Sequence, residues 1–277
     1  MKIDAHQHFW RYSPEEYDWI DERMRAIRSD FFPEALSPLL QAAGIDGTVA
    51  VQARQTLGET HWLLELARRN AFIRGVVGWV PLADPGVADL LSALAPNPRF
   101  KGVRHVVQGE PDPAFLEGAA FNAGLRAVTA HGLVYDILIL APQLPAALAL
   151  VDRHPQQRFV LDHIAKPVVQ GAPPAEWRRH LRELARRENV ACKFSGIVTE
   201  VPGWQWTPEL LRPYFDAVLE AFGPHRLMFG SDWPVCLVAA NYARWHDFVK
   251  ECAAALSPTE RAAILGETAT RIYRLTA

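Results

Sequence analysis

Two histidines near the start of the chain have the spacing of a functional pair. The first ten residues read MKIDAHQHFW. If Ile3 to Phe9 forms a strand, side chains two apart share a face, so Asp4, His6 and His8 point the same way. Imidazole is the commonest metal ligand and carries protons near neutral pH, so this spacing indicates a metal or proton-transfer site. Such pairs also occur as ordinary polar structure, and the site therefore needs partners from elsewhere in the chain.

Asp232 is the first candidate partner. It stands in the stretch Phe229 to Pro234, where Gly230 permits close approach and proline ends a strand. A carboxylate there could ligate a metal, take a proton from water or cap a turn. Its combination with the histidine pair favours the catalytic role.

Two pairs of adjacent polar residues follow other apolar runs. In Asp162-His163 we expect His163 to face the pocket and Asp162 to support neighbouring backbone. Arg104 suits an oxyanion or carboxylate through its forked donors, and His105 suits a hydrogen bond to substrate. The spacing does not tell which of these two faces inward.

Further polar or aromatic side chains stand at strand ends or in loops. Lys193 is expected to pair with a structural charge or to bind substrate. Of the nine tryptophans, those at strand ends or in long loops are expected to stack on a sugar-like ring, namely Trp10, Trp204, Trp206 and Trp233, whereas Trp19 is expected to pack in the core. The candidate substrate-binding residues are Arg54, Arg104, His105, Tyr135, Trp204 and Trp233.

The candidate site residues lie on or next to short apolar runs, which alternate along the chain with segments of helical periodicity. The predicted strands are Ile3 to Phe9, Gly47 to Ala53, Arg74 to Leu82, Lys101 to Val107, Leu133 to Leu140, Arg158 to Ile164, Val190 to Ile197 and Arg226 to Ser231. The predicted helices are Pro33 to Ala43, His61 to Asn70, Val87 to Leu94, Ala114 to Ala130, Pro142 to His154, Glu176 to Glu188, Pro208 to Phe222, Tyr242 to Leu256 and Pro258 to Leu275.

This alternation predicts an α/β fold, a (β/α)8 barrel of the TIM type that spans residues 1–277 as one domain. A doubly wound open sheet is the alternative, but no G-x-G-x-x-G follows any predicted strand. Long insertions at Arg11 to Phe32 and Val198 to Thr207 follow strand carboxyl ends, where barrel enzymes build their active sites.

Composition narrows the class of protein. The chain has 277 residues and a net charge of −2, without the basic, aromatic-rich patch of a nucleic-acid-binding protein. No run approaches the roughly 18 apolar residues of a membrane helix. Three cysteines without a pairing pattern and no signal-peptide pattern predict a reducing, cytoplasmic location. The oligomeric state is left open by the sequence, and an oligomer is compatible with it.

The motifs taken together resemble the amidohydrolase superfamily, in its branch of sugar lactonases. The resemblance rests on residues 3–10, 101–105, 161–167, 192–196 and 226–234, and it extends along essentially the whole chain. It implies an amidohydrolase-like (β/α)8 barrel that hydrolyses an aldonolactone, such as L-fuconolactone, to the open-chain acid. The motifs do not specify which sugar is used or the size of its lactone ring.

The resemblance also implies roles for individual residues. Asp232 matches a general base acting on water, and His6, His8 and His163 match active-site histidines; these four are also the candidate metal ligands. The predicted fifth strand offers Tyr135 and Asp136 in place of a ligand that bridges two metals, so a two-metal site is not expected. One divalent ion, zinc for preference, or no metal at all both remain open.

Three other functions are alternatives. A metal-dependent decarboxylase or a dicarboxylate lactonase of the same superfamily would need several cations at the barrel mouth, where the sequence offers Arg54, Arg104, Lys166 and Lys193. A non-catalytic binding barrel would leave the polar residues at the strand ends unexplained. The sequence therefore favours a lactone hydrolase that acts on a small, neutral sugar lactone.

Overall fold

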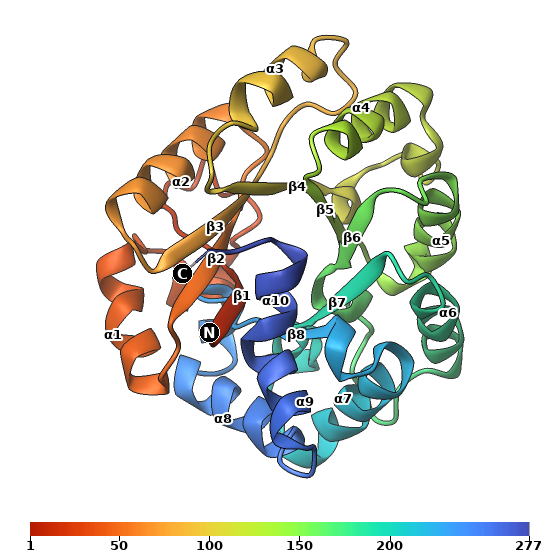
Figure 1. Ribbon diagram of the computed structural model, residues 1–277. Helices are drawn as coiled ribbons and strands as arrows, with labels where there is room; N and C mark the ends of the chain where they lie inside the picture. Colours follow the sequence, from red (N-terminus) through yellow and green to blue (C-terminus); the bar gives the residue numbers. More distant parts are fainter. Residues whose placement is uncertain (277) are drawn as a thin grey trace.

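The strands of the computed structural model, which describes residues 1–276, form one sheet around a central axis (Figure 1). All neighbouring strands are parallel and follow the order of the chain, as predicted for the barrel. Each strand ends one to four residues before its predicted carboxyl end. The bounds are β1 Ile3–Gln7, β2 Gly47–Val51, β3 Ile73–Gly78, β4 Phe100–Val106, β5 Val134–Leu138, β6 Arg158–Leu161, β7 Val190–Phe194 and β8 Leu227–Phe229.

The α-helices pack around the strands and close one end of the barrel (Figure 1). They are α1 Pro33–Ala43, α2 Leu57–Arg69, α3 Val87–Leu94, α4 Ala119–Ala130, α5 Leu144–Arg153, α6 Ala175–Ala185, α7 Pro208–Phe222, α8 Tyr242–Cys252, α9 Pro258–Ala262 and α10 Thr268–Ile272. The predicted bounds of α1, α3 and α7 are confirmed. The predicted helix Pro258 to Leu275 is divided by a π-helical segment, Ala263–Glu267, where the backbone of Gly266 passes so close to Met1 that a Cβ would lie 2.1 Å from the Met1 carbonyl oxygen.

The inside of the barrel is apolar at the amino ends of the strands. Small and branched side chains from successive strands form one cluster there, which α10 and Tyr273 complete; its strand members include Ile3, Ala5, Val49, Val51, Val77, Val134, Val160, Ala191 and Met228. Burial of such side chains is the main favourable contribution to folding. A larger apolar cluster fills the space between the strands and the surrounding helices. The strands that carry the functional side chains are therefore packed on both faces.

A β-bulge in β1 changes which side chains face the barrel interior. Between Asp4 and Gln7 the pairing with β2 gains one residue, since Asp4 pairs with Thr48 and Gln7 with Ala50. The prediction that Asp4 lies beside His6 and His8 is therefore wrong. The Asp4 carboxylate accepts hydrogen bonds from the Ser231 backbone N–H at 2.8 Å and the Tyr242 hydroxyl at 3.1 Å.

The barrel closes through the segment that follows β8. The backbone N–H of Asp232 donates to the His6 carbonyl oxygen at 2.8 Å, and that of His8 donates to the Trp233 carbonyl oxygen at 2.7 Å. These two bonds interleave the first and last functional stretches of the chain. Residues more than 200 positions apart thus become neighbours in one site.

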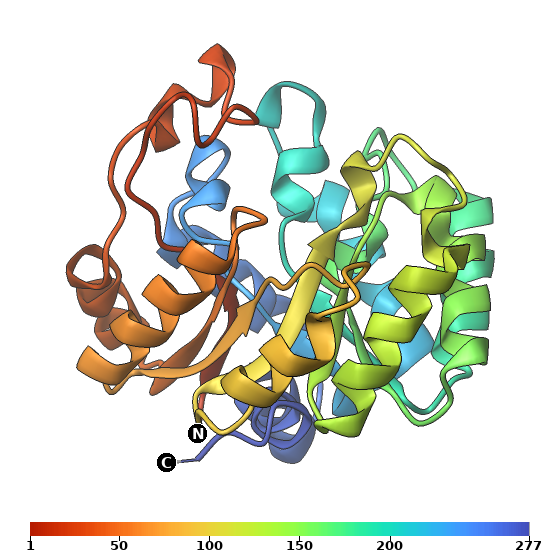
Figure 2. The same cartoon turned by 90° about the horizontal axis from the view of Figure 1, so that it is seen from above.

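The long insertions gather at one end of the barrel. Figure 2 shows the loop of residues 11–32 (red) and the loop of residues 198–207 (cyan) at the end opposite the two termini. This is the end at which the strand carboxyl ends open. Among the described residues, no helix has the length and apolar character needed to cross a membrane.

Candidate active site

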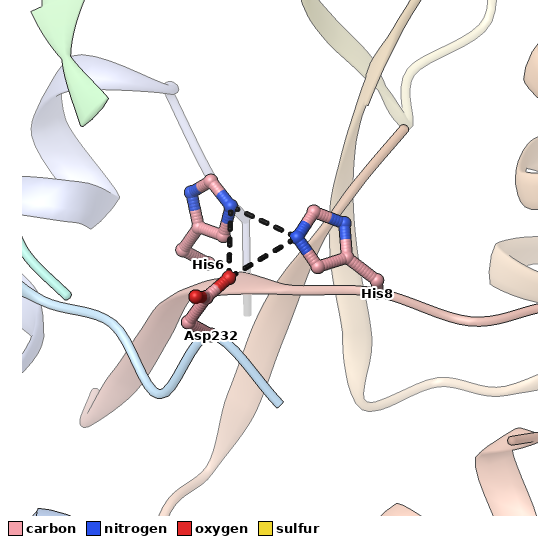
Figure 3. Close-up of side chains that lie close together, drawn as sticks. All are labelled: His6, His8 and Asp232. Carbon is pink, nitrogen blue, oxygen red and sulfur yellow. Dashed lines mark hydrogen bonds and ion pairs between the residues drawn. The ribbon is translucent and has the colours of Figure 1, made fainter. Parts of the chain in front are cut away.

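His6, His8 and Asp232 form a triangle at the carboxyl ends of the strands (Figure 3). Nε2 of His6 lies 3.2 Å from Nε2 of His8, and Oδ1 of Asp232 lies 3.3 Å from Nε2 of His8 and 3.7 Å from Nε2 of His6. All three side chains are buried. The bulge in β1 and the closure beside β8 therefore bring three ligand atoms to one point.

The orientation of His8 determines which of its ring atoms faces the triangle. Its Nδ1 lies 2.8 Å from the Val51 carbonyl oxygen, and because a carbonyl can only accept, Nδ1 must carry the proton of that bond. In the neutral ring Nε2 is then an unprotonated nitrogen facing the Asp232 carboxylate. Two acceptors at 3.3 Å need a proton or a metal cation between them.

His163 approaches the same carboxylate from the other side. Its Nε2 lies 3.9 Å from Oδ1 of Asp232, and its Nδ1 forms a 2.9 Å hydrogen bond with Oγ of Ser195. Gly196 leaves the space for this ring, since a Cβ there would lie 2.4 Å from Nδ1 of His163. The residue also adopts φ +64°, which glycine tolerates best.

The prediction that Asp162 and His163 lie on opposite faces of a strand is wrong, because β6 ends at Leu161. Both residues belong to a tight turn, Asp162–Ala165, and both side chains are buried near His6. Asp162 lies 3.4 Å from Nδ1 of His6 through Oδ1, while Oδ2 accepts from Nη1 of Arg104 at 3.0 Å.

The electrostatic environment favours an ionised Asp232 and neutral rings for His6 and His163. Burial alone would raise the pKa of Asp232, but His163, His8 and His6 together hold it below its ordinary value. Burial lowers the pKa of His163 to about 4, against the opposing effect of Asp232 and Asp162. Burial also lowers the pKa of His6 well below its ordinary value. At neutral pH the pocket thus holds a carboxylate able to accept a proton.

A layer of four buried charges lies beneath the triangle. Its members come from neighbouring strands or strand ends: Arg104, Asp136, Asp162 and Lys193. Nζ of Lys193 contacts Asp136 at 2.5 Å and Asp162 at 3.0 Å, and it lies 3.2 Å from Nδ1 of His6. The two acids and two bases balance, which limits the cost of burying them. Lys193 was expected to pair with a structural charge or to bind substrate. Its side chain is fully buried and pairs with two carboxylates, which fits the first of these roles.

A cavity of about 600 Å³ opens above the triangle. His8, His163, Asp232, Arg104 and Arg54, all predicted as site residues, line it. Lys166, which the sequence offered as a cation at the barrel mouth, lines it as well. Residues that the sequence did not assign to the site also line it: Glu15, Glu16, Asp18, Trp19, Gln55 and Gln108. Trp19, expected to serve packing, does contact Trp10 edge to face, but it also lines the cavity and is 40 % exposed.

Four predicted substrate-binding residues are not brought to this cavity. His105 bonds Glu110 at 2.6 Å and stacks on Phe115, so Arg104 is the member of that pair that faces inward. Tyr135 is fully buried in the layer outside the strands, and Trp233 packs against Phe31 and Phe9. Trp204 lies in the loop of residues 198–207, outside the residues that line the cavity. Trp10 and Trp206 are buried in apolar clusters, not offered as stacking faces.

Within residues 1–276, two groups of side chains have ligand atoms close enough to hold a metal ion, and they share His6. One is His6, His8 and Asp232; the other is His6, Asp162 and His163. In the second group the Lys193 ammonium lies 3.0 Å from Asp162, where it would repel a metal cation. The first group brings together two imidazole nitrogens and a carboxylate oxygen, which is the donor chemistry of a catalytic zinc site. Nη1 of Arg104 lies 3.3 Å from Nε2 of His6 in this group.

The fold and site together define a barrel hydrolase with a His/Asp centre at the carboxyl ends of its strands. The sequence profile described as amidohydrolase matches residues 3–275. The chain therefore belongs to the amidohydrolase family, as its motifs indicated.

Several known proteins are similar to this chain over nearly its whole length. An L-fucono-1,5-lactonase of Burkholderia multivorans is 42% identical, over 99% of this chain and 96% of that protein. An L-fucono-1,5-lactonase of Burkholderia ambifaria is 38% identical, with the same shares covered. The crystal structure of an amidohydrolase from Burkholderia multivorans with bound zinc superposes with a TM-score of 0.96, at 43% identity and with 100% of both chains covered.

Proposed function

We propose that this protein is a hydrolase that opens a sugar lactone to the aldonic acid, with L-fucono-1,5-lactone as its first candidate substrate. The observation that carries the proposal is the ionised Asp232 carboxylate at the base of a cavity of about 600 Å³, beside three histidines. The names of the two relatives above, which match nearly the whole chain, support the same activity and the same sugar.

Asp232 is the proposed general base. It takes a proton from a water molecule, and the resulting hydroxide attacks the lactone carbonyl carbon. The bond from this carbon to the ring oxygen then breaks, and the ring oxygen leaves as an alcohol after it takes the proton that Asp232 removed from water. His163, held by Ser195, is placed to donate a hydrogen bond to the oxygen that becomes negative during attack.

His6, His8 and Asp232 are the proposed ligands of one divalent ion, zinc for preference. When bound there, such an ion polarises a carbonyl oxygen and lowers the pKa of water. The protein contributes the fixed orientation of these ligands: Val51 holds His8, and Asp162 lies beside Nδ1 of His6. Such outer partners set the ring orientation of ligating histidines.

A neutral substrate fits the charges of the cavity better than a diacid does. Arg54 is paired with Glu16 at 2.6 Å, and Arg104 is bonded to Asp162 and Gln52. Glu15, Glu16, Asp18 and Asp232 add negative charge. The decarboxylase and the dicarboxylate lactonase therefore rank below the sugar lactonase, since both act on anionic substrates.

The same proposal extends to the setting of the enzyme. We place it in the reducing cytoplasm as one domain over residues 1–277, acting on a small molecule and not on nucleic acid or membranes. All three cysteines, Cys192, Cys236 and Cys252, are free and buried, which supports a chain that does not need disulfides.

A pH-indicator assay over stereochemically distinct aldonolactones tests the proposal. Fucono-, rhamnono-, galactono- and arabinono-lactones are offered with and without added zinc or chelator, and aromatic acids are offered in parallel for release of carbon dioxide. We expect acid release from L-fucono-1,5-lactone above the spontaneous rate. Carbon dioxide release without any lactone hydrolysis would replace the proposal with a decarboxylase.

A further inference from the structure

The turn that follows β6 has an unusual backbone. Four consecutive residues that are not glycine adopt positive φ: His163 at 51°, Ile164 at 50°, Ala165 at 60° and Lys166 at 45°. Left-handed residues normally occur singly, because each puts Cβ too close to the following carbonyl oxygen, at roughly 1–2 kcal/mol per residue. Three of these four residues are buried, and such a run persists only where the surrounding structure imposes the conformation.

Packing and hydrogen bonds hold the turn in place. Ile164 and Ala165 are fully buried in the main core, and the Trp177 indole N–H donates to the Ile164 carbonyl oxygen at 2.8 Å. The backbone N–H of Lys166 donates to the His163 carbonyl oxygen at 2.8 Å. His163 and Lys166 are therefore held close together, and both line the cavity above Asp232.

Lys166 differs from the other two cations that line the cavity. Arg54 and Arg104 both form close bonds to carboxylates. Nζ of Lys166 forms no hydrogen bond within residues 1–276, and its nearest carboxylate oxygen, Oε1 of Glu200, lies 3.9 Å away. That distance exceeds the usual 2.7–3.2 Å of an N–H···O bond. The ammonium group therefore has donors available for a ligand.

The proposed reaction creates the ligand that this ammonium group suits. A lactone is neutral, but its hydrolysis product is a carboxylate, formed a short distance from Asp232. Resting on the proposed function, we infer that Lys166 is a product-binding residue, which receives the new carboxylate of the open-chain aldonate while His163 faces the reacting carbon.

Glu200 competes with the product for Lys166. Burial raises the pKa of Glu200, while the charge of Lys166 opposes this, so the two side chains share a poorly solvated edge of the site. When the aldonate leaves, the Glu200 carboxylate is the anion that remains beside Lys166. Removing the charge of Glu200 should therefore tighten product binding, and removing that of Lys166 should weaken it.

Binding of sodium L-fuconate, measured by titration calorimetry on the full chain, tests this inference without turnover. L-fucitol, which replaces the carboxylate by a neutral CH2OH group, is the comparison ligand. For Lys166→Met we expect the Kd for L-fuconate to rise at least about tenfold, the value expected for one charge-assisted hydrogen bond. The Kd for L-fucitol should stay within about twofold, because no carboxylate is involved.

Three further variants define the outcome. Lys166→Arg should retain most of the L-fuconate affinity, Glu200→Gln should increase it, and Lys250→Met, which removes an exposed positive charge, should leave it unchanged. An unchanged L-fuconate Kd in Lys166→Met would overturn the inference. Equal losses for L-fuconate and L-fucitol would also overturn it, since they would indicate a structural role for Lys166.

The inference and the proposed function can fail separately. If the wild-type protein hydrolyses L-fucono-1,5-lactone but Lys166→Met binds L-fuconate normally, only the inference is wrong. If the wild type hydrolyses no lactone but binds L-fuconate through Lys166, the carboxylate site stands and the proposed reaction does not.

Discussion

Nε2 of His8 lies 3.3 Å from Oδ1 of Asp232, although the two residues are 224 positions apart in the chain. The other ring nitrogen of His8 donates to the Val51 carbonyl oxygen, so in the neutral ring two acceptors face each other at the centre of the site. A proton or a metal ion must lie between them. Whether a metal ion binds between His8 and Asp232 therefore bears directly on how Asp232 takes part in the reaction.

Zinc content tests which of the two occupies that position. We expect the wild-type protein, dialysed against zinc and then against buffer, to retain about one zinc ion per chain, as for a three-ligand site. His8→Asn should weaken zinc affinity by more than about tenfold, since it removes one of three ligands. Plasma mass spectrometry measures the content, and His131→Asn, an exposed histidine at the end of α4, is the matched control. Equal zinc in His8→Asn and wild type would place the metal elsewhere.

Gly196 is expected to be required for the position of His163. Gly196→Ala adds a Cβ that would lie 2.4 Å from Nδ1 of His163 and 3.1 Å from Oδ2 of Asp232, at a residue with φ +64°. We expect kcat/KM to fall more than about tenfold, because small displacements of catalytic groups are costly. Gly44→Ala, at the end of α1, is the control, since Gly44 has φ +66° and a Cβ there would meet only Nζ of Lys2, at 3.9 Å. Both variants should lose stability from backbone strain, and a similar loss of activity in both would contradict the role of Gly196.

Lys193 is expected to be essential to stability. Lys193→Met leaves Asp136 and Asp162 buried without their ammonium partner, at a cost of about 3–5 kcal/mol in the free energy of unfolding. The double variant Lys193→Met/Asp136→Asn should recover part of this loss, because it removes one uncompensated charge. Urea unfolding measures both, with the exposed Lys250→Met as control, for which we expect a change below about 1 kcal/mol. Additive effects of the two substitutions would contradict the coupling.

Glu59 gives the stability a pH dependence. Its buried carboxylate accepts hydrogen bonds from the backbone N–H groups of Ala53 and Arg54, and burial raises its pKa to about 7. The folded state then binds a proton more tightly than the unfolded state, so this contribution to stability is fully present below about pH 4.5 and is lost as pH rises through about 7.

We expect Glu59→Gln to flatten that dependence, by at most about 3 kcal/mol. The free energy of unfolding of both proteins, measured in urea from about pH 5 to about pH 8, provides the comparison. If the variant and the wild type showed parallel curves over this range, the pKa of Glu59 would not differ between the folded and unfolded states.

The sequence was sufficient for the barrel, the family and the main catalytic side chains, because these depend on regular alternation and on motifs. The (β/α)8 barrel and membership in the amidohydrolase family are confirmed. The structure brings His6, His8, His163 and Asp232 to one place, as the motifs predicted, and their roles remain a proposal.

What the sequence could not provide are the departures from regular geometry. A period of two places Asp4 with His6, but one extra residue in β1 turns Asp4 toward α8. The same period separates Asp162 from His163, whereas a left-handed turn of residues that rarely adopt that conformation brings both to the site. Trp19 lies in a long loop, and only the folded loop shows that its ring reaches the cavity.

The proposed role of Asp232 as general base is most directly tested by the turnover of Asp232→Asn on L-fucono-1,5-lactone. Asparagine keeps the size and one oxygen of the side chain but cannot accept a proton from water. We predict a loss of about 10²- to 10⁴-fold in kcat, the range for removal of a general base, with a circular-dichroism melt close to that of the wild type. Near wild-type turnover in this variant would contradict the assignment of Asp232 and the mechanism that depends on it.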